Sequence, residues 1–379
     1  MTEIKGFRGI RYKMKDITPV LCPPYDVVSP EMRKQLIRKS QYNLIRIELP
    51  DSYEDADRKL RSWQKKGVMI RDKEPSIYVC RQEFSAGGKD YARTGFFCAM
   101  KLDQKKTLKH EKVSLKPIGD RLSLMKSVRG NISPIFCLFE DGNNSIKKKL
   151  KAITAQQPGM KFKDSQGLAH KLWVVNDGKI IASIGKNLQK KKALIADGHH
   201  RFTTASTYLA EKKKKNPKGA KDAPYSYVLT FLCPLDDDGM IILPTHRVVR
   251  MSSDIWSMTK SKFNIKQWNG KGRPPIVRYH SGRFEQLVPK RKTNDISVRI
   301  LHSLLLDRIY KKEDIRYIKD SNEAVQLADK MGGMAFLLDA PDPDRVYGES
   351  KRGKIMPHKT TYFYPKIPAG AVIYSFRDQ

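Results

Sequence analysis

The chain has 379 residues, of which 39% are apolar and 30% are charged, and its 74 lysines and arginines against 40 aspartates and glutamates give a formal charge of +34. This apolar content is enough for buried cores and excludes an intrinsically disordered chain, and the length indicates two or three compact units. No apolar run reaches the roughly 18 residues of a membrane-spanning helix, and residues 1–10 lack the apolar stretch of a signal peptide, so we expect a cytoplasmic protein with no membrane partner.

The positive charge is spread almost evenly along the chain, with +13 over residues 1–130, +11 over residues 131–250 and +10 over residues 251–379. Lysine runs such as 190–192 and 212–215 are typical of solvated helix faces and loops. The even spread argues against a dedicated nucleic-acid surface. We expect at most a non-specific, salt-sensitive affinity for nucleic acids.

Five cysteines, an odd number, are far apart in the sequence and form no C-x-x-C pair: Cys22, Cys80, Cys98, Cys137 and Cys233. This spacing excludes the usual zinc and redox motifs. Most of them lie in apolar runs, so we expect buried thiols.

The first hundred residues alternate helix and strand signals. Ser29 and Pro30 predict the start of a helix that ends near Ser40, and residues 51–66 predict a second, charged helix. Apolar and polar residues alternate within residues 43–50, which predicts a strand there. Residues 76–84 and 93–102 predict two strands joined by a Gly87-Gly88 turn.

The middle of the chain contains a clear strand–turn–helix pattern. After a polar connection over residues 110–131 and a strand over residues 135–139, residues 172–175 and 179–183 predict a hairpin across Asp177-Gly178. A strand over residues 193–196 then reaches a glycine turn, and a helix is predicted over residues 199–215. A strand over residues 225–233 is expected to pair with one over residues 240–243 through the turn at 236–239.

The last third predicts helices over residues 296–308 and 321–331 and a strand over residues 334–338. We therefore expect an α+β fold, with mixed sheets and flanking helices. The predicted domains are a core of residues 1–250, with two sub-lobes (1–140 and 141–250) as an option, and a smaller α+β domain of residues 251–379. The sequence does not indicate an oligomeric state.

The turn at Asp197-Gly198 predicts an anion site. A buried strand leads into it and a helix begins at once, so the first backbone N–H groups of the helix lack intrahelical partners and attract negative charge. Arg201 would add bidentate hydrogen bonds to a phosphate. Asp197 has two interpretations, a helix N-cap or a group that holds Mg²⁺ or orients a histidine. Of the adjacent His199 and His200, one is expected to face the pocket as a proton carrier or phosphate donor.

Six segments, spread in order over nearly the whole chain, are residues 23–27 (PPYDV), 43–50 (NLIRIELP), 93–96 (RTGF), 196–202 (ADGHHRF), 243–247 (LPTHR) and 356–366 (MPHKTTYFYPK). Together they resemble domain-of-unknown-function family 1015. This resemblance implies kinship rather than a particular activity.

The segment Asp197-Gly198-His199-His200-Arg201 is also similar to the signature of the ParB/sulfiredoxin superfamily, whose strand–turn–helix binds nucleotide phosphates. Within that superfamily, the free-serine kinases have the most similar motif. The resemblance implies that Asp197, His199, His200 and Arg201 line a phosphate-transfer site, with Gly198 at the phosphate, and that a carboxylate from an earlier strand meets the substrate hydroxyl. Glu48 is the candidate for that carboxylate. Sulfiredoxin itself fits poorly, because it has a cysteine where this motif has histidine.

Other polar clusters offer additional candidates. His246 and Arg247 follow a predicted strand and are candidates for a second histidine–arginine pair at the phosphate, or else for a solvated strand end. Lys359 and Lys366 bracket the aromatic residues 362–364, where a base could stack and a phosphate could be held, although an aromatic strand packed in a core is an equal alternative. A P-loop, a nucleophile elbow and an H-E-x-x-H metal motif are all missing from the sequence. Residues 236–238 resemble the paired aspartates of haloacid-dehalogenase phosphatases but lack the following threonine.

The sequence therefore predicts a nucleotide-linked phosphotransferase or phosphohydrolase that acts on a small hydroxyl compound, with serine or phosphoserine suggested by the kinase resemblance. The expected catalytic residues are Asp197, His199, His200 and Glu48, and the expected phosphate-binding residues are Gly198, Arg201, His246, Arg247 and Lys359. The expected cofactors are Mg²⁺, held by Asp197, and ATP or ADP. The alternative is a non-enzymatic nucleotide- or nucleic-acid-binding protein.

Overall fold

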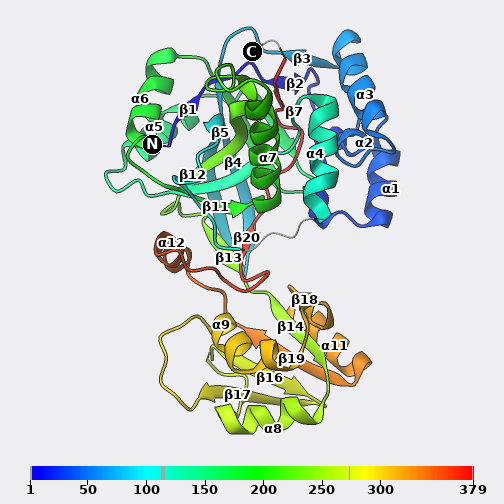
Figure 1. Cartoon of the computed structure of the whole chain (residues 1–379), viewed down its shortest axis with the longest axis vertical. Helices are drawn as coiled ribbons and strands as arrows, with labels where there is room; N and C mark the ends of the chain where they lie inside the picture. The colour runs from blue at the N-terminus through cyan, green and yellow to red at the C-terminus, as the bar shows by residue number, and fades with distance from the viewer. Residues whose placement is uncertain (1, 112–115, 273, 378) are drawn as a thin grey trace. The chain divides into compact units, whose positions relative to one another are not determined.

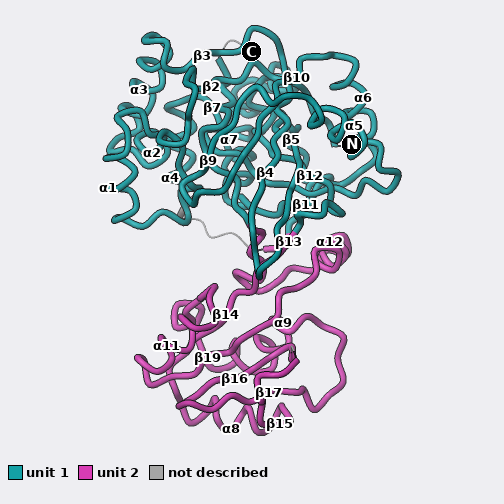
Figure 2. The backbone as a smooth tube through the Cα atoms, turned by 180° about the vertical axis from the view of Figure 1, so that it is seen from behind, with its two compact units in different colours: residues 1–109, 113–240, 365–379 teal, residues 110–112, 241–364 magenta. Residues whose placement is uncertain are grey.

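A computed structural model describes residues 2–111, 116–272, 274–377 and 379. The chain forms two compact units, which Figure 2 shows in two colours. Unit 1 comprises Met1–Lys109, Val113–Met240 and Pro365–Gln379, and unit 2 comprises His110–Lys112 and Ile241–Tyr364. The predicted domain boundary lies after residue 250, whereas the main part of unit 2 begins ten residues earlier, at Ile241. The last fifteen residues belong to unit 1.

Unit 1 is built on a nine-stranded mixed sheet within the described residues. Its strands, in spatial order, are β6 (Thr107–Leu108), β11 (Ala193–Asp197), β8 (Ile135–Phe139), β12 (Tyr227–Pro234), β5 (Lys89–Lys101), β4 (Ile77–Ala86), β10 (Ala169–Val175) and β9 (Met160–Lys163), with β1 (Ile4–Lys5) beside β5. The β11–β6 and β12–β8 pairs are parallel and the others antiparallel. Strands from both sides of residue 140 are neighbours in this sheet, so unit 1 is not divided into two sub-lobes there.

Helices flank the sheet of unit 1 (Figure 1). They are α1 (Pro30–Lys39), α2 (Ile45–Glu48), α3 (Tyr53–Lys65), α4 (Lys116–Val128), α5 (Ser145–Thr154), α6 (Gly178–Leu188) and α7 (His199–Lys215). One buried apolar cluster joins the sheet to α5, α6 and α7 through residues such as Ile146, Ile184 and Phe202. Two short antiparallel pairs complete the unit, β2 (Ile10–Tyr12) with β3 (Met69–Arg71) and β7 (Gly130–Asn131) with β21 (Tyr374–Ser375).

Unit 2 contains a six-stranded antiparallel sheet within the described residues. Its order is β15 (Phe263–Gln267), β17 (Arg283–Pro289), β16 (Ile276–His280), β19 (Gly333–Leu338), β14 (His246–Arg250) and β18 (Arg316–Ile318). Its helices are α8 (Ser253–Lys262), α9 (Ser297–Leu301), α10 (Asp307–Ile309), α11 (Ser321–Met331) and α12 (Pro343–Lys351). A separate pair joins β13 (Ile241–Leu243) to β20 (Tyr362–Tyr364). The α+β class predicted from the sequence is confirmed in both units.

Most of the predicted elements are present. Ser29 caps α1 by accepting a hydrogen bond from the N–H of Met32 at 3.2 Å, as the Ser-Pro pattern predicts. Strands β4 and β5 form the predicted pair around Gly87-Gly88. The strand–turn–helix of β11 and α7 is also found where the sequence predicts it.

The prediction of a strand over residues 43–50 was wrong, because Ile45–Glu48 form the short helix α2. The Asn43 side chain explains the difference: its oxygen accepts from the N–H of Ile45 at 3.0 Å, and its amide nitrogen donates to the carbonyls of Pro19 and Leu21. Apolar and polar residues alternate only over residues 45–48, which is about the length of one helical turn. Glu48 is buried as Ile45 and Ile47 are, so the alternation of polar and apolar residues does not separate a solvent face from a core face.

The predicted hairpin over residues 172–183 was also wrong. β10 is a strand, but Lys179–Ser183 belong to helix α6. Asp177 caps this helix by accepting from the N–H groups of Lys179 and Ile180, so the Asp-Gly pair marks a helix start rather than a hairpin turn.

The polar connection expected over residues 110–131 contains helix α4, which has Leu124, Met125 and Val128 buried. The sequence did not predict this helix, because the charged Arg121 interrupts its apolar pattern. Arg121 lies on the same buried face as Leu124 and Val128, at helical spacing. The predicted pairing of residues 225–233 with residues 240–243 is wrong as well, because β12 pairs with β5 and β8 while β13 pairs with β20.

The five cysteines are free and buried, which confirms the sequence prediction. Burial raises the pKa of the Cys80 thiol to about 12, so a thiolate is disfavoured there. In the part of the chain that the structure describes, no helix combines the length and the apolar character needed to cross a membrane.

Gly95, in the Arg93-Thr94-Gly95-Phe96 segment, allows β5 to pack closely on β12. A Cβ atom at this position would lie 2.5 Å from the carbonyl oxygen of Leu232 and 2.5 Å from the ring of Phe231. We expect Gly95→Ala to lower the free energy of unfolding by about 1–3 kcal/mol, measured by urea denaturation. The matched control is Gly119→Ala in α4, where a Cβ atom meets nothing within 4 Å. This change should stabilise the protein by about 0.5–1 kcal/mol, and equal effects of the two substitutions would contradict the packing account.

Candidate functional site

The strand–turn–helix of unit 1 leaves a helix start without a side-chain cap. β11 ends at Asp197, and Gly198 follows at φ 92° as the N-cap residue of α7, with no side-chain capping bond. Helix geometry gives the first N–H groups of α7 no intrahelical acceptor, and Gly198 has no side chain that could cap them. Asp197 is the last residue of the strand, so its interpretation as the N-cap is wrong.

Gly198 is required by both its conformation and its surroundings. A side chain is disfavoured at this φ, and a Cβ atom would lie 3.1 Å from Arg201 Nε and from Ile135 Cγ2. The guanidinium of Arg201 therefore packs directly over the turn.

Asp197 is the centre of a buried ionic network. Its Oδ2 accepts from Arg201 Nη2 at 2.5 Å, and its Oδ1 accepts from Lys366 Nζ. Arg201 also donates from Nη1 to the carbonyl of Pro134. The side chains of Asp197 and Lys366 are each 13% exposed, and that of Arg201 is 10% exposed. Two cations thus share one carboxylate beside the start of a helix.

This network controls the protonation of Asp197. Burial alone would raise the pKa of the carboxyl, but the positive charges of Lys366 and Arg201 outweigh burial and hold the pKa well below its usual range. Burial would lower the pKa of Arg201, and the charge of Asp197 more than compensates, so the guanidinium stays protonated. Asp197 and Arg201 therefore keep their charges at any physiological pH.

The C-terminal segment that carries Lys366 is fixed to the sheet by Arg93. This arginine is fully buried; its Nε donates to Gln82 Oε1 at 3.0 Å, and its Nη2 donates to the carbonyl of Pro365. Gln82 in turn donates to the carbonyl of Lys366 at 3.4 Å. The guanidinium lies 4.7 Å from the ring centroid of Phe136, which is the partner of Asp197 in the β8–β11 ladder. Arg93 thus ties the backbone of Lys366 to the strand next to Asp197.

Glu48 is buried at the end of α2, with 2% of its surface exposed. Arg121 of α4 donates to its backbone carbonyl at 2.6 Å, and the Arg121 Nη1 lies 3.9 Å from Glu48 Oε1. The same guanidinium is 4.5 Å from the ring centroid of Tyr25, whose pKa is raised to about 12 by burial. Tyr25 belongs to the segment 23–27 that the sequence comparison singled out.

Glu48 and Arg201 face one small cavity of about 40 Å³. Its other lining residues come from α4, the segment around β7, α7 and β12, and they are Arg121, Leu124, Met125, Gly130, Asn131, Ile132, Ser133, Thr204 and Val228. The expected base and the expected phosphate ligand therefore lie on one cavity, although one belongs to α2 and the other to α7.

The two histidines occupy the first turn of α7. His199 is buried and His200 is half-buried. The charge of His199 contributes to lowering the pKa of Asp197, which places its ring in the field of the network. The expectation that one histidine of the pair faces the site stays a prediction.

The remaining predicted phosphate ligands, His246, Arg247 and Lys359, belong to unit 2. His246 Nδ1 accepts from the N–H of Leu338 at 3.1 Å, and burial lowers the pKa of His246 to about 4. Arg247 donates to the backbone carbonyls of Thr245, His358 and Lys359. Both side chains therefore have structural partners within unit 2.

The donor set around Asp197 does not fit a metal ion held by the protein. The motif supplies a single carboxylate, and both of its oxygens already accept from cations. Over the described ranges, no group of three or more histidine, cysteine, aspartate or glutamate side chains is arranged to hold a metal. A magnesium ion at such a site would have to arrive with the phosphates of a nucleotide.

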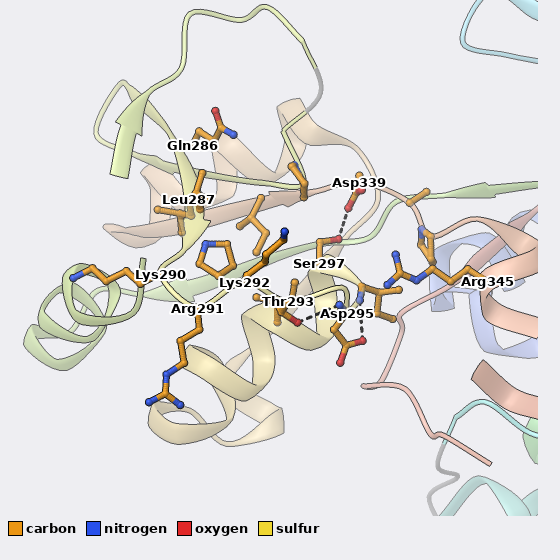
Figure 3. Close-up of a pocket in the computed structure, with 18 of the residues that line it drawn as sticks. Gln286, Leu287, Lys290, Arg291, Lys292, Thr293, Asp295, Ser297, Asp339 and Arg345 are labelled. Carbon is orange, nitrogen blue, oxygen red and sulfur yellow. Dashed lines mark hydrogen bonds between the residues drawn. The ribbon is translucent and has the colours of Figure 1, made fainter. Parts of the chain in front are cut away.

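Unit 2 contains a cavity of about 640 Å³ between β17 and the start of α9 (Figure 3). Lys292 projects into it, and Ser297 donates to Asp339 at its wall. Among the described residues that line it, none was predicted as a site residue.

The predicted residues Glu48, Asp197, Gly198, His199, His200 and Arg201 all belong to unit 1. The structure joins Arg201 to Asp197 in an ion pair and to Glu48 through one cavity. Lys366, Arg121 and Tyr25 are not among the residues that the sequence analysis chose for the site. Lys366 ended the quoted segment 356–366, but the nearby aromatics directed the choice to Lys359. Arg121 was assigned to a loop, and only its helical spacing with Leu124 and Met125 could have indicated a buried position.

Comparison with known proteins places the chain in a family. The family described as "Protein of unknown function (DUF1015)" matches residues 4–308, and the chain belongs to it. A search of curated proteins found no match.

Several solved structures are similar at low sequence identity. SbnI with a C-terminal truncation, from Staphylococcus aureus, is 8% identical over 72% of this chain and 85% of its own, with a TM-score of 0.44. A mutant of a free serine kinase in complex with ADP is 14% identical over 73% and 92%, with a TM-score of 0.40. A conserved hypothetical protein from Pyrococcus furiosus is 14% identical over 73% and 95%, with a TM-score of 0.36. TM-scores below 0.5 assign no activity to this chain.

The ionic network makes a prediction about stability and pH. Because the pKa of Asp197 is lower in the folded state than in the unfolded chain, its contribution to stability is complete above pH 4 to 5 and is lost as the pH falls through the folded value. Asp197→Asn leaves Lys366 and Arg201 without their counter-charge, so we expect this variant to be less stable than the wild type at pH 7. The difference should narrow below about pH 4. Urea denaturation of both proteins from pH 8 to pH 3 measures it, and a difference independent of pH would contradict the role of the carboxylate.

Proposed function

We propose that unit 1 is a nucleotide-linked phosphotransferase that transfers a phosphoryl group to a small hydroxyl compound, with serine as the first candidate. The observation that carries the proposal is the arrangement around one turn: a helix start without a side-chain cap, a buried arginine and lysine that share one carboxylate, and a buried glutamate on the cavity that the arginine lines. The similarity of the motif at residues 197–201 to nucleotide-binding proteins supports the same function.

The phosphoryl group belongs at the start of α7. The N–H groups of the first turn, Arg201 and Lys366 present positive charge to one place, and phosphoryl transfer depends mainly on such positioned charge. In the structure, Asp197 is the negative group that pairs with Arg201 and Lys366. Part of the hydrogen bonding of Arg201 and Lys366 passes from Asp197 to the phosphate oxygens when the nucleotide binds.

The acceptor hydroxyl belongs at Glu48. The hydroxyl oxygen forms a bond to the terminal phosphorus, the bond between that phosphorus and the bridging oxygen of the nucleotide breaks, and the hydroxyl proton passes to the Glu48 carboxylate. The products are the phosphate ester and the nucleotide shortened by one phosphate. A positioned base of this kind typically contributes about 100- to 10,000-fold in rate.

The direct experiment is ³¹P NMR of the full chain with ATP, ADP or CTP, with serine as acceptor and with Mg²⁺ present. The proposal requires a new phosphate-ester resonance that grows as the nucleotide is consumed. Nucleotide binding without transfer or hydrolysis would instead favour a non-enzymatic nucleotide-binding protein. Loss of that binding at moderate salt would indicate a non-specific polyanion surface.

Glu48→Gln tests the role of Glu48 as the base independently of nucleotide binding. The amide keeps the size of the side chain but cannot take the proton, so we expect the rate of transfer to fall at least 100-fold while the affinity for the nucleotide changes little. Single-turnover rates and equilibrium binding of the nucleotide test both parts. Transfer at the wild-type rate would remove Glu48 from the mechanism.

Arg201→Lys and Lys366→Met test the phosphate side. Each change removes donors that stabilise the transferred group, and we expect losses of about 100- to 1,000-fold in kcat. The matched control is Lys191→Met, which breaks another lysine–aspartate pair of unit 1, with Asp141 at 3.1 Å, away from the motif. The control should retain wild-type turnover. An equal loss in all three variants would mean that they act through stability alone, which circular dichroism would show.

A further inference from the structure

The cavity at Glu48 contains two buried hydroxyl groups that have no hydrogen-bond partner among the described residues. They are Ser133 Oγ and Thr204 Oγ1, and their residues are 7% and 0% exposed. Ser133 lies just after β7 and Thr204 in the second turn of α7, so two separate parts of the chain each direct a polar group to the same space.

Buried hydroxyl groups of this kind require a polar hydrogen-bond partner, either water or a ligand. Buried hydroxyls in folded proteins are nearly always hydrogen-bonded, and one left unsatisfied costs about 1–3 kcal/mol. Two of them on one cavity that also has Glu48, Arg121 and Asn131 in its wall mark a polar compartment rather than a packing defect. The compartment therefore holds water in the resting protein and a hydroxyl-bearing group when a ligand is bound.

The volume of the cavity limits the size of that group. About 40 Å³ has room for roughly three water molecules, or about three non-hydrogen atoms of a ligand. A hydroxymethyl group and the carbon that bears it have this size. An extra methyl group on the hydroxyl-bearing carbon would compete for the same space with the side chains of Leu124, Met125 and Val228.

Arg121 borders a second, larger cavity that has room for the rest of the ligand. It lines the small cavity and also a second cavity of about 490 Å³, which the N-termini of α1 and α3 border through Ser29 and Ser52. A ligand with its hydroxymethyl end at Glu48 can place its remaining substituents past Arg121 in this larger space.

We infer that the cavity lined by Ser133, Thr204 and Glu48 is an acceptor pocket that selects short primary alcohols over secondary ones. The inference rests on the proposed function, because it names the substrate class for the same site. In this pocket, Ser133 and Thr204 hydrogen-bond the hydroxyl group of the ligand. The apolar wall excludes a methyl group on the carbon that bears this hydroxyl.

The experiment compares three pairs of compounds that differ by that one methyl group: ethanolamine with 1-amino-2-propanol, L-serine with L-threonine, and glycolate with lactate. Dissociation constants for the full chain are measured by ligand-observed NMR without a nucleotide, so that the result does not depend on turnover. In at least one pair, we expect the primary alcohol to bind at least tenfold more tightly than its methylated partner. The three pairs are cationic, zwitterionic and anionic. The charge of the pair that binds most tightly shows which charged substituent the larger cavity at Arg121 binds.

Three variants identify the pocket. Thr204→Val keeps the shape but removes one hydroxyl, so binding of the primary alcohol should weaken about tenfold while the fold is unaffected. Thr204→Ser removes the methyl group instead and should bring the secondary alcohol to within about threefold of the primary one. The matched control is Thr203→Val. The Thr203 hydroxyl is also buried and has no partner in the part of the chain that the structure describes, but Thr203 does not line the cavity, so its removal should leave binding of the primary alcohol unchanged.

The outcomes separate this inference from the proposed function. Binding of a primary alcohol that is weakened by Thr204→Val but not by Thr203→Val, together with no phosphoryl transfer to that alcohol, would keep the pocket and reject the phosphotransferase. Transfer that is equally fast in Thr204→Val and wild type would keep the enzyme and overturn the pocket. Binding of none of the six compounds, or equal binding within every pair, would overturn the inference as well.

Discussion

The arrangement of unit 1 depends on one buried carboxylate, that of Asp197, which Arg201 and Lys366 share. Removing charges from water is costly, and a buried ion pair repays that cost only with good geometry and further hydrogen bonds. Arg201 also bonds to the Pro134 carbonyl and packs over Gly198, and Arg93 fixes the backbone that carries Lys366. The chain thus holds two cations and one anion at the start of a helix, a place that favours negative charge.

This arrangement accounts for several sequence features at once. Glycine at position 198 permits the turn, the buried Arg93 fixes the last segment of unit 1, and the short helix α2 brings Glu48 to the cavity that Arg201 lines. Segments that are distant in the sequence, 23–27, 43–50, 93–96, 196–202 and the end of 356–366, therefore contribute to a single site.

The sequence predicted the α+β class and the strand–turn–helix that carries the candidate site, because these depend on local signals: a buried strand, a glycine and a helix start. It failed where tertiary contacts override local patterns. The alternation at residues 45–48 is compatible with a strand, but hydrogen bonds from Asn43 to distant carbonyls set a helical turn. Lys366 and Arg121 could not be assigned, because their positions depend on the return of the last fifteen residues to unit 1 and on the burial of a charged face of α4.

The central claim is that the charge around Asp197 is a phosphate site of a transfer enzyme. A crystal structure of the full chain with a non-hydrolysable ATP analogue tests it most directly. We predict the terminal phosphate at the first turn of α7, within hydrogen-bonding distance of Arg201 and Lys366, with Lys366 turned from Asp197 toward the phosphate. An analogue bound elsewhere, with the contacts of Asp197 to Arg201 and Lys366 unchanged, would contradict the account.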